Sequence, residues 1–175
     1  LSASSRANVR IRNLCVHGPI TSGIAMRLSG TVRSEVSGCS ITKAGLYGIH
    51  LLSSSVGNLV YDNSLDSNLN YQIYVADANC TGNLIDSNYV NHGATVGIYI
   101  AAHQNGITRN RVAHSAGHGI ALVNANSCTV SSNTVQDKFG PTSTYGIFVS
   151  GSSNTVYDNR LYSIPGSHIF LSTTA

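Results

Sequence analysis

The segment Ile85-Asp-Ser-Asn-Tyr-Val90 recurs along the chain in close variants. The clear copies are Val60-Tyr-Asp-Asn-Ser-Leu65, Ile107-Thr-Arg-Asn-Arg-Val112, Val130-Ser-Ser-Asn-Thr-Val135 and Val156-Tyr-Asp-Asn-Arg-Leu161, with weaker copies at 11–16 and 36–41. Their central residues form one column, made of Leu14, Cys39, Asn63, Asn88, Asn110, Asn133 and Asn159. A second column five residues upstream is made of Asn58, Asn83, Asn105, Cys128 and Asn154. Self-similarity at a regular period is the signature of a repeat protein.

A second recurring segment, Gly97-Ile-Tyr-Ile-Ala101, lies between copies of the first. Its first isoleucine recurs at intervals of 22 to 27 residues, at Ile24, Ile49, Ile73, Ile98, Ile120, Ile147 and Ile169. Such alternation of β-branched or leucine residues with others is typical of a strand with one buried face. The glycine before most of these isoleucines is expected to give a tight bend into the strand.

Both patterns fit a coil of two or three short strands joined by turns. Each strand pairs in parallel with its equivalent in the next coil, so that like residues stack about 4.8 Å apart. Asparagine suits the turns because it tolerates the left-handed conformation, and stacked asparagines also hydrogen-bond from coil to coil. The sequence therefore predicts one all-β domain over 1–175, a parallel solenoid of about seven coils with asparagine ladders.

Composition excludes several classes of protein. Charged residues are only 10% of the chain and the net charge is +3 with scattered basic residues, which argues against coiled coils and against a usual nucleic-acid binder. No apolar run approaches the roughly 18 residues of a membrane helix, so no membrane insertion is expected. The four cysteines lack metal-ligand spacing, and the repeat indicates that Cys39 and Cys128 are single buried thiols in place of ladder asparagines.

These repeats resemble the right-handed parallel β-helix of the pectin-lyase-like superfamily over about residues 8–172. The resemblance implies the right hand of the coil and a module of a polysaccharide-binding or polysaccharide-degrading protein. The candidates are a tailspike-type depolymerase or a uronate lyase or epimerase, at an extracellular or virion surface location. The alternative is a non-catalytic structural or receptor-binding spike segment. Family members usually have more coils and a capping helix, so the chain is expected to be a segment of a larger protein.

Strand alternation places an unusual set of side chains outside the Gly-Ile strands. One outward column is Ala25, His50, Tyr74, Tyr99, Ala121, Phe148 and Phe170, and a second contains Arg27. Tyr47, Tyr71 and Tyr145 flank these columns just upstream. An exposed apolar stripe of this size marks a binding surface. Its occupant is an acidic polysaccharide, a second subunit of a homotrimer, or loops of the same chain. Substrate binding is expected at Arg27, Tyr47, Tyr71, Tyr74 and Tyr99.

Two groups of residues are candidates for catalysis. Tyr47-Gly-Ile-His50 is similar to the Tyr-Gly-Phe-Asp-Pro-His stretch of mannuronan epimerases, but His50, Leu51 and Leu52 replace the Asp, Pro and His. A uronate lyase or epimerase needs a base and a cation for the carboxylate, which Lys43 or His50 and Arg27 could provide. The second group is a column of turn residues, made of His92, His114 and Asp137.

Carboxylates do not form the pairs that glycosidic hydrolysis requires, at separations of about 5–9.5 Å. Asp62 and Asp158 are four coils apart, Asp62 and Asp86 are expected to point to opposite sides, and Asp66 is a lone acid in the turn column. No cofactor and no metal site is expected.

Overall fold

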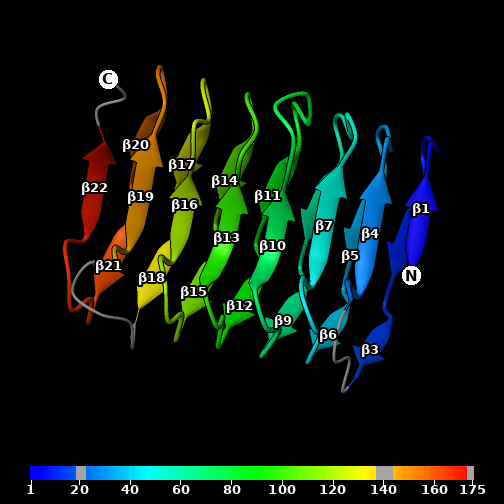
Figure 1. Ribbon diagram of the computed structural model, residues 1–175, viewed down its shortest axis with the longest axis horizontal. Coiled ribbons are helices and arrows are strands. Elements are labelled where there is room, and N and C mark those ends of the chain that lie inside the picture. The colour runs from blue at the N-terminus through cyan, green and yellow to red at the C-terminus, as the bar shows by residue number, and fades with distance from the viewer. Residues whose placement is uncertain (19–22, 137–143, 173–175) are drawn as a thin grey trace.

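The computed structural model describes residues 1–18, 23–136 and 144–172, and every element in these ranges is a strand (Figure 1). Successive coils lie side by side along the long axis of the molecule, from β1 at the N-terminal end to β22 at the C-terminal end (Figure 1). Each coil contributes one strand to each of three parallel sheets. Seven coils contribute all three strands, as predicted, and β22 begins an eighth.

The three sheets differ in the strand that each coil supplies. The first sheet contains β1 (Ser2–Ser4), β4 (Met26–Ser29), β7 (Ile49–Leu52), β10 (Tyr71–Val75), β13 (Val96–Ile100), β16 (Ile120–Leu122), β19 (Ile147–Ser150) and β22 (Ile169–Ser172). The second contains β2 (Arg10–Arg12), β5 (Glu35–Ser37), β8 (Leu59–Tyr61), β11 (Leu84–Asp86), β14 (Gly106–Thr108), β17 (Thr129–Ser131) and β20 (Thr155–Tyr157). The third contains β3 (Cys15–His17), β6 (Ser40–Thr42), β9 (Ser64–Asp66), β12 (Tyr89–Asn91), β15 (Arg111–Ala113), β18 (Thr134–Gln136) and β21 (Arg160–Tyr162).

The predicted register of the first sheet holds from β7 onward but was wrong by two residues at β4, the first Gly-Ile segment. Met26, not Ile24, pairs with Ile49, and Arg27 pairs with His50. Ile24, Met26 and Leu28 alternate without a break, so the apolar pattern fits two registers equally well. The correction moves Arg27 into the outward column that contains His50.

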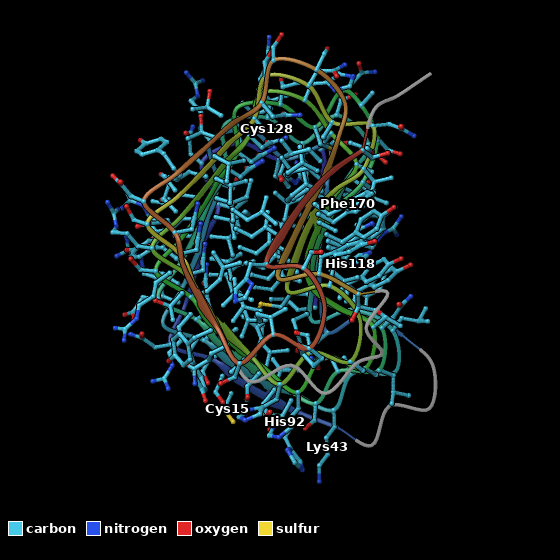
Figure 2. All side chains as sticks on the ribbon, turned by 90° about the vertical axis from the view of Figure 1, so that its left-hand side faces the viewer. Cys15, Lys43, His92, His118, Cys128 and Phe170 are labelled. Carbon is cyan, nitrogen blue, oxygen red and sulfur yellow. The ribbon has the colours of Figure 1, made fainter. Side chains whose placement is uncertain are left out.

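The core fills the inside of the coil with columns of apolar side chains from all three sheets (Figure 2). Ile49, Ile73, Ile98 and Ile120 are fully buried in one such column of the first sheet, and Val60, Ile85 and Ile107 line the second sheet. Full burial of one such side chain stabilises the fold by about 1.5–3 kcal/mol. Because each column continues through successive coils, the core has no break between repeats.

The two asparagine columns are buried hydrogen-bonded ladders, as predicted. The Nδ2 of Asn88 donates to the Oδ1 of Asn110 at 3.0 Å and to the Val60 carbonyl at 2.9 Å. The backbone N–H of Asn88 donates to the same Oδ1 at 2.9 Å. Asn63, Asn110 and Asn133 repeat this pattern. The Asn88 side chain thus satisfies two buried backbone groups of the preceding coil, the Asn63 N–H and the Val60 carbonyl, and also bonds to the asparagine of the following coil.

The left-handed turn position is not the ladder asparagine itself, which corrects one of our expectations. The residue before each ladder asparagine has positive φ, as at Asp62 (52°), Ser87 (52°) and Arg109 (54°). The ladder asparagines keep ordinary φ angles because their side chains must point inward along the stack.

The glycines before the first-sheet strands serve close packing as well as the expected bend, which Gly48, Gly119 and Gly146 adopt. Gly97, Gly119 and Gly146 are absent from the positions with positive φ. A Cβ at Gly97 would lie 2.5 Å from Val112 Cγ1 and 2.7 Å from the Gly119 carbonyl oxygen. These positions have no room for a side chain.

Cys39 and Cys128 are buried free thiols in the ladders, as the repeat indicated. Cys128 Sγ accepts the Asn105 N–H at 3.5 Å and donates to the Ala102 carbonyl at 3.3 Å. These contacts are longer than those of the asparagine rungs, so the ladder is weakest here.

Cys128→Asn is expected to stabilise the protein by about 1 kcal/mol, because an amide of similar size completes the ladder. Urea unfolding measures the change. Cys80→Asn is the matched control, since Cys80 is equally buried but lies off the ladder positions, and it should destabilise. Loss of stability in Cys128→Asn would show that the thiol is better accommodated than an amide at this rung.

Candidate functional site

The outward side of the first sheet carries two groups of aromatic rings. Strand register places Arg27, His50, Tyr74, Tyr99, Ala121, Phe148 and Phe170 in one outward column. A flanking column, at the first residue of a strand or just before it, contains Tyr47, Tyr71, Val96, His118 and Tyr145. We call the nine rings of these two columns the aromatic face: Tyr47, His50, Tyr71, Tyr74, Tyr99, His118, Tyr145, Phe148 and Phe170. Figure 2 shows His118 and Phe170 on this side of the coil.

The N-terminal half of the aromatic face consists of two stacks at a steep angle to each other. Tyr71 is stacked on Tyr47 with centroids 5.5 Å apart and on Tyr99 with centroids 4.5 Å apart. Tyr74 is stacked on His50 at 4.7 Å with 6° between the planes. The Tyr74 ring lies at 77° to that of Tyr99, an edge-to-face contact. Both arrangements are favourable for aromatic pairs.

The C-terminal half is one set of nearly parallel rings. Tyr145 is stacked on His118 at 5.3 Å and on Phe170 at 4.4 Å, and Phe148 is stacked on Phe170 at 5.8 Å. Sequence reasoning left His118 out of this surface, although it directly precedes Gly119 as Tyr47 precedes Gly48. Small buried residues, Val96 and Ala121, separate the two halves.

Ring orientation determines what the surface offers to a ligand. Stacking along the coil occupies ring faces with neighbouring rings, so the face does not present the flat platforms expected for sugar rings. In the part of the chain that the structure describes, no group hydrogen-bonds to the hydroxyls of Tyr47, Tyr71, Tyr74 or Tyr99, and none of these hydroxyls is a buried atom. Burial raises the pKa of Tyr71, Tyr74 and Tyr99, so the hydroxyls remain protonated and able to donate.

His50 differs from its neighbours because it is buried. Only 7% of its surface is exposed, and neither ring nitrogen has a hydrogen-bond partner. Burial first and the nearby Arg27 charge second lower the pKa of His50 to about 4, and Asp77 opposes the shift. The imidazole is therefore neutral at neutral pH. Arg27, directly opposite in the preceding coil, is exposed.

The other catalytic candidates lie at a different corner of the coil. Lys43, His92 and His114 have positive φ and follow β6, β12 and β15 in one turn column. Figure 2 shows Lys43 and His92 together and away from His118 and Phe170. The structure thus joins Arg27, Tyr47 and His50 on one surface but places Lys43 elsewhere.

His92 and His114 form a stacked pair with centroids 4.8 Å apart. His92 Nδ1 lies 2.9 Å from Asp66 Oδ1, and His114 Nδ1 lies 2.7 Å from Asn91 Oδ1. Sequence reasoning missed the partner role of Asp66, which stands one residue before the turn column on the preceding coil. Asp137 lies outside the described residues. Among the residues that are described, no group of three or more His, Cys, Asp and Glu side chains could hold a metal ion.

The comparison with protein families identifies the architecture. Residues 1–135 match the model of the right-handed β-helix region. The chain belongs to the right-handed β-helix family. This settles the hand of the coil, which the repeat alone did not provide. No curated protein matches the sequence of this β-helix.

Solved structures of the same fold superpose on nearly the whole β-helix. The Dettilon tailspike protein matches with a TM-score of 0.78 and 14% identity, over 95% of this chain and 38% of its own. A mutant of the periplasmic alginate epimerase AlgG matches with a TM-score of 0.73 and 12% identity, over 99% of this chain and 47% of its own. DFA-IIIase from Arthrobacter chlorophenolicus, in complex with DFA-III, matches with a TM-score of 0.70 and 14% identity, over 97% of this chain and 55% of its own. The chain thus spans about half the length of these proteins or less, and the likeness establishes the fold.

Acidic side chains of the second sheet are engaged in ion pairs. Asp86 accepts from Arg109 at 2.7 Å and from Thr108 at 2.6 Å. Glu35 accepts from Arg12 at 2.7 and 2.8 Å, and hydrogen bonds from Arg12 and Ser37 lower the pKa of Glu35 to about 2. These carboxylates have their partners within the β-helix, which suits a structural role.

No helix that is long and apolar enough to cross a membrane occurs in residues 1–18, 23–136 and 144–172.

Proposed function

We propose that this β-helix is a polysaccharide-binding module and that its aromatic face holds an acidic polysaccharide. The observation that supports the proposal is the group of four tyrosine hydroxyls on three successive coils, none of them hydrogen-bonded to a described residue. A polysaccharide presents many hydroxyl groups in a row, and phenols can both donate hydrogen bonds to them and accept from them. Arg27 adds a positive charge at the N-terminal end of this row.

The comparisons support this choice of ligand. An alginate epimerase acts on a polysaccharide by its name, and DFA-IIIase was solved with DFA-III bound. By analogy with these proteins and with the tailspike, we place the module at an extracellular or virion surface location, within a larger protein. A shared fold does not establish a shared ligand, so the main support for the proposal is the row of four tyrosine hydroxyls.

Geometry favours binding over catalysis in this segment. Lys43, His92 and His114 follow strands of the third sheet whereas Arg27 lies in the first, and the nitrogens of His50 are closed off from solvent. A lyase or epimerase reaction at Arg27 and His50 requires movement of the side chains that cover the imidazole. The proposal is therefore binding of the polysaccharide, and it does not require one of these residues to act as a base.

A subunit interface is the second candidate for the same surface. The C-terminal half of the aromatic face contains two phenylalanines, Phe148 and Phe170, and Phe170 is 37% exposed. Apolar rings without hydroxyls suit contact with a second copy, as in a homotrimer, better than contact with sugar.

Tyr71→Phe and Tyr99→Phe test the proposal, because each removes one hydroxyl and keeps the ring stack. Each is expected to weaken binding to an acidic polysaccharide about 3- to 10-fold, the effect of one net hydrogen bond, with little change in melting temperature. Affinity electrophoresis in gels that contain the polysaccharide measures the change. Tyr157→Phe is the matched control, since Tyr157 is 51% exposed on the second sheet.

The competing function has its own signature in the same variants. If neither hydroxyl affects binding, and sedimentation shows that Phe148→Ala dissociates an oligomer, the aromatic face is a subunit interface and the proposal is wrong.

A further inference from the structure

His50 is an unusual residue to find buried in an aromatic stack. Both of its ring nitrogens are buried without a partner, and an unsatisfied buried polar group costs stability. Phenylalanine would fill the same place between Tyr47 and Tyr74 without that cost, as Phe148 does two coils after Tyr99. Packing therefore does not explain the histidine.

Of the two charged groups near His50, Asp77 has a hydrogen-bond partner and Arg27 has none within the ranges that the structure describes. Arg27 lies directly opposite on β4, and no described residue forms an ion pair or hydrogen bond with its guanidinium. Asp77, which follows β10, accepts a hydrogen bond from the Ser53 N–H at 2.7 Å. The remaining neighbours are the phenol rings of Tyr74, at 4.7 Å, and Tyr47, at 4.9 Å. The site thus holds one unpaired cation beside one unpartnered imidazole.

We propose that Arg27 and His50 form an oxyanion subsite at the N-terminal end of the aromatic face, which binds a carboxylate or sulfate group of the polysaccharide and takes up one proton at His50 on binding. This inference rests on the proposed function and adds the anionic group and its linkage to pH. The oxyanion pairs with the Arg27 guanidinium, and protonated His50 donates an N–H to it. The proton comes from solvent, and no covalent bond is made or broken.

Access requires a small rearrangement. Arg27 is exposed and Tyr47 is half-buried, so their side chains can move without disturbing the core columns. The arginine then approaches the ligand as the imidazole is uncovered, and the buried nitrogens gain the partner that they lack in the free protein.

The sign of the pH dependence follows from the free state. The pKa of His50 is lowered to about 4, by burial first and by Arg27 second. An adjacent anion favours the imidazolium and raises this pKa. Binding is therefore coupled to proton uptake, and affinity increases as pH falls toward the free-state pKa of His50, about 4. Below the free-state value of about 4 the histidine is already protonated, and the gain ends.

Calorimetry on the intact chain measures the coupled proton. Oligogalacturonate supplies carboxylates, dextran sulfate supplies sulfates and dextran is the neutral control, each titrated at pH 6 in buffers of different ionisation enthalpy. We expect net proton uptake with at least one anionic ligand and none with dextran, and the ligand that gives the larger uptake identifies the oxyanion.

Two variants test the residues of the subsite. Arg27→Gln should weaken anionic binding about 10-fold, and His50→Phe should abolish the proton uptake. His17→Gln, an exposed histidine of β3 in the third sheet, should leave the uptake unchanged.

Nuclear magnetic resonance of the wild-type imidazoles makes the test independent of variant folding. The His50 resonances should titrate near pH 4 without ligand and at higher pH with it. Polysaccharide binding that is independent of pH between 5 and 8, or proton uptake that persists in His50→Phe, overturns the subsite but leaves the hydroxyl row as a binding surface. Absence of binding to all three polysaccharides overturns both proposals.

Discussion

Asn110→Leu is expected to lower the free energy of unfolding by about 3 kcal/mol. The Asn110 amide donates to the Ile85 carbonyl and to Asn133, and its Oδ1 accepts two hydrogen bonds from Asn88. Leucine removes all four bonds. It leaves the Asn88 N–H and the Ile85 carbonyl buried without partners, and the penalty comes mainly from these two groups.

Urea unfolding followed by circular dichroism measures this loss. Asn79→Leu is the matched control, because Asn79 is exposed and lies outside the ladders, so its substitution should change stability by less than about 0.5 kcal/mol. An equally small change in Asn110→Leu would mean that water replaces the ladder without cost, contrary to the burial of the column.

Gly119→Val is expected to prevent cooperative folding or to cost more than about 3 kcal/mol, because overpacking of a close-packed core forces backbone shifts. A Cβ at Gly119 would lie 2.4 Å from Val135 Cγ1 and 2.7 Å from the Gly146 carbonyl oxygen. The Val135 side chain can rotate away. The Gly146 carbonyl belongs to the neighbouring parallel strand and can move only with that strand.

Gly106→Ala separates this packing effect from a general intolerance of substituted glycines. A Cβ at Gly106 would meet only Leu84 Cδ1, at 2.9 Å, the flexible end of a side chain. This variant should therefore fold with nearly normal stability in thermal unfolding. If Gly119→Val is equally stable, the close approach of neighbouring coils at this column is not a constraint.

The ladders and the coil number could be predicted from sequence because each coil repeats the same chemistry. A buried asparagine needs a partner at the same position in the next coil, so the Asn63, Asn88 and Asn110 column determines the register. The segment around Ile24 offered no such marker, and apolar alternation alone left two registers open. The close packing at the glycines was also missed, because a sequence does not show how near the adjacent strand lies.

Membership of the aromatic face was largely predictable, but its geometry was not. Tyr71, Tyr74 and Tyr99 were placed on the outside by strand alternation. Whether their rings lie flat on the surface or stack along the coil depends on side-chain torsions, which strand period does not determine. For the same reason the sequence could not show that His50 is covered by its neighbours.

A crystal structure of the protein with a bound oligogalacturonate tests the central claim most directly. The account predicts a sugar chain along the first sheet, with its hydroxyls within hydrogen-bond distance of Tyr47, Tyr71 and Tyr99 and a carboxylate at Arg27. A second protein copy packed on the aromatic face, with the sugar bound elsewhere or absent, would contradict it.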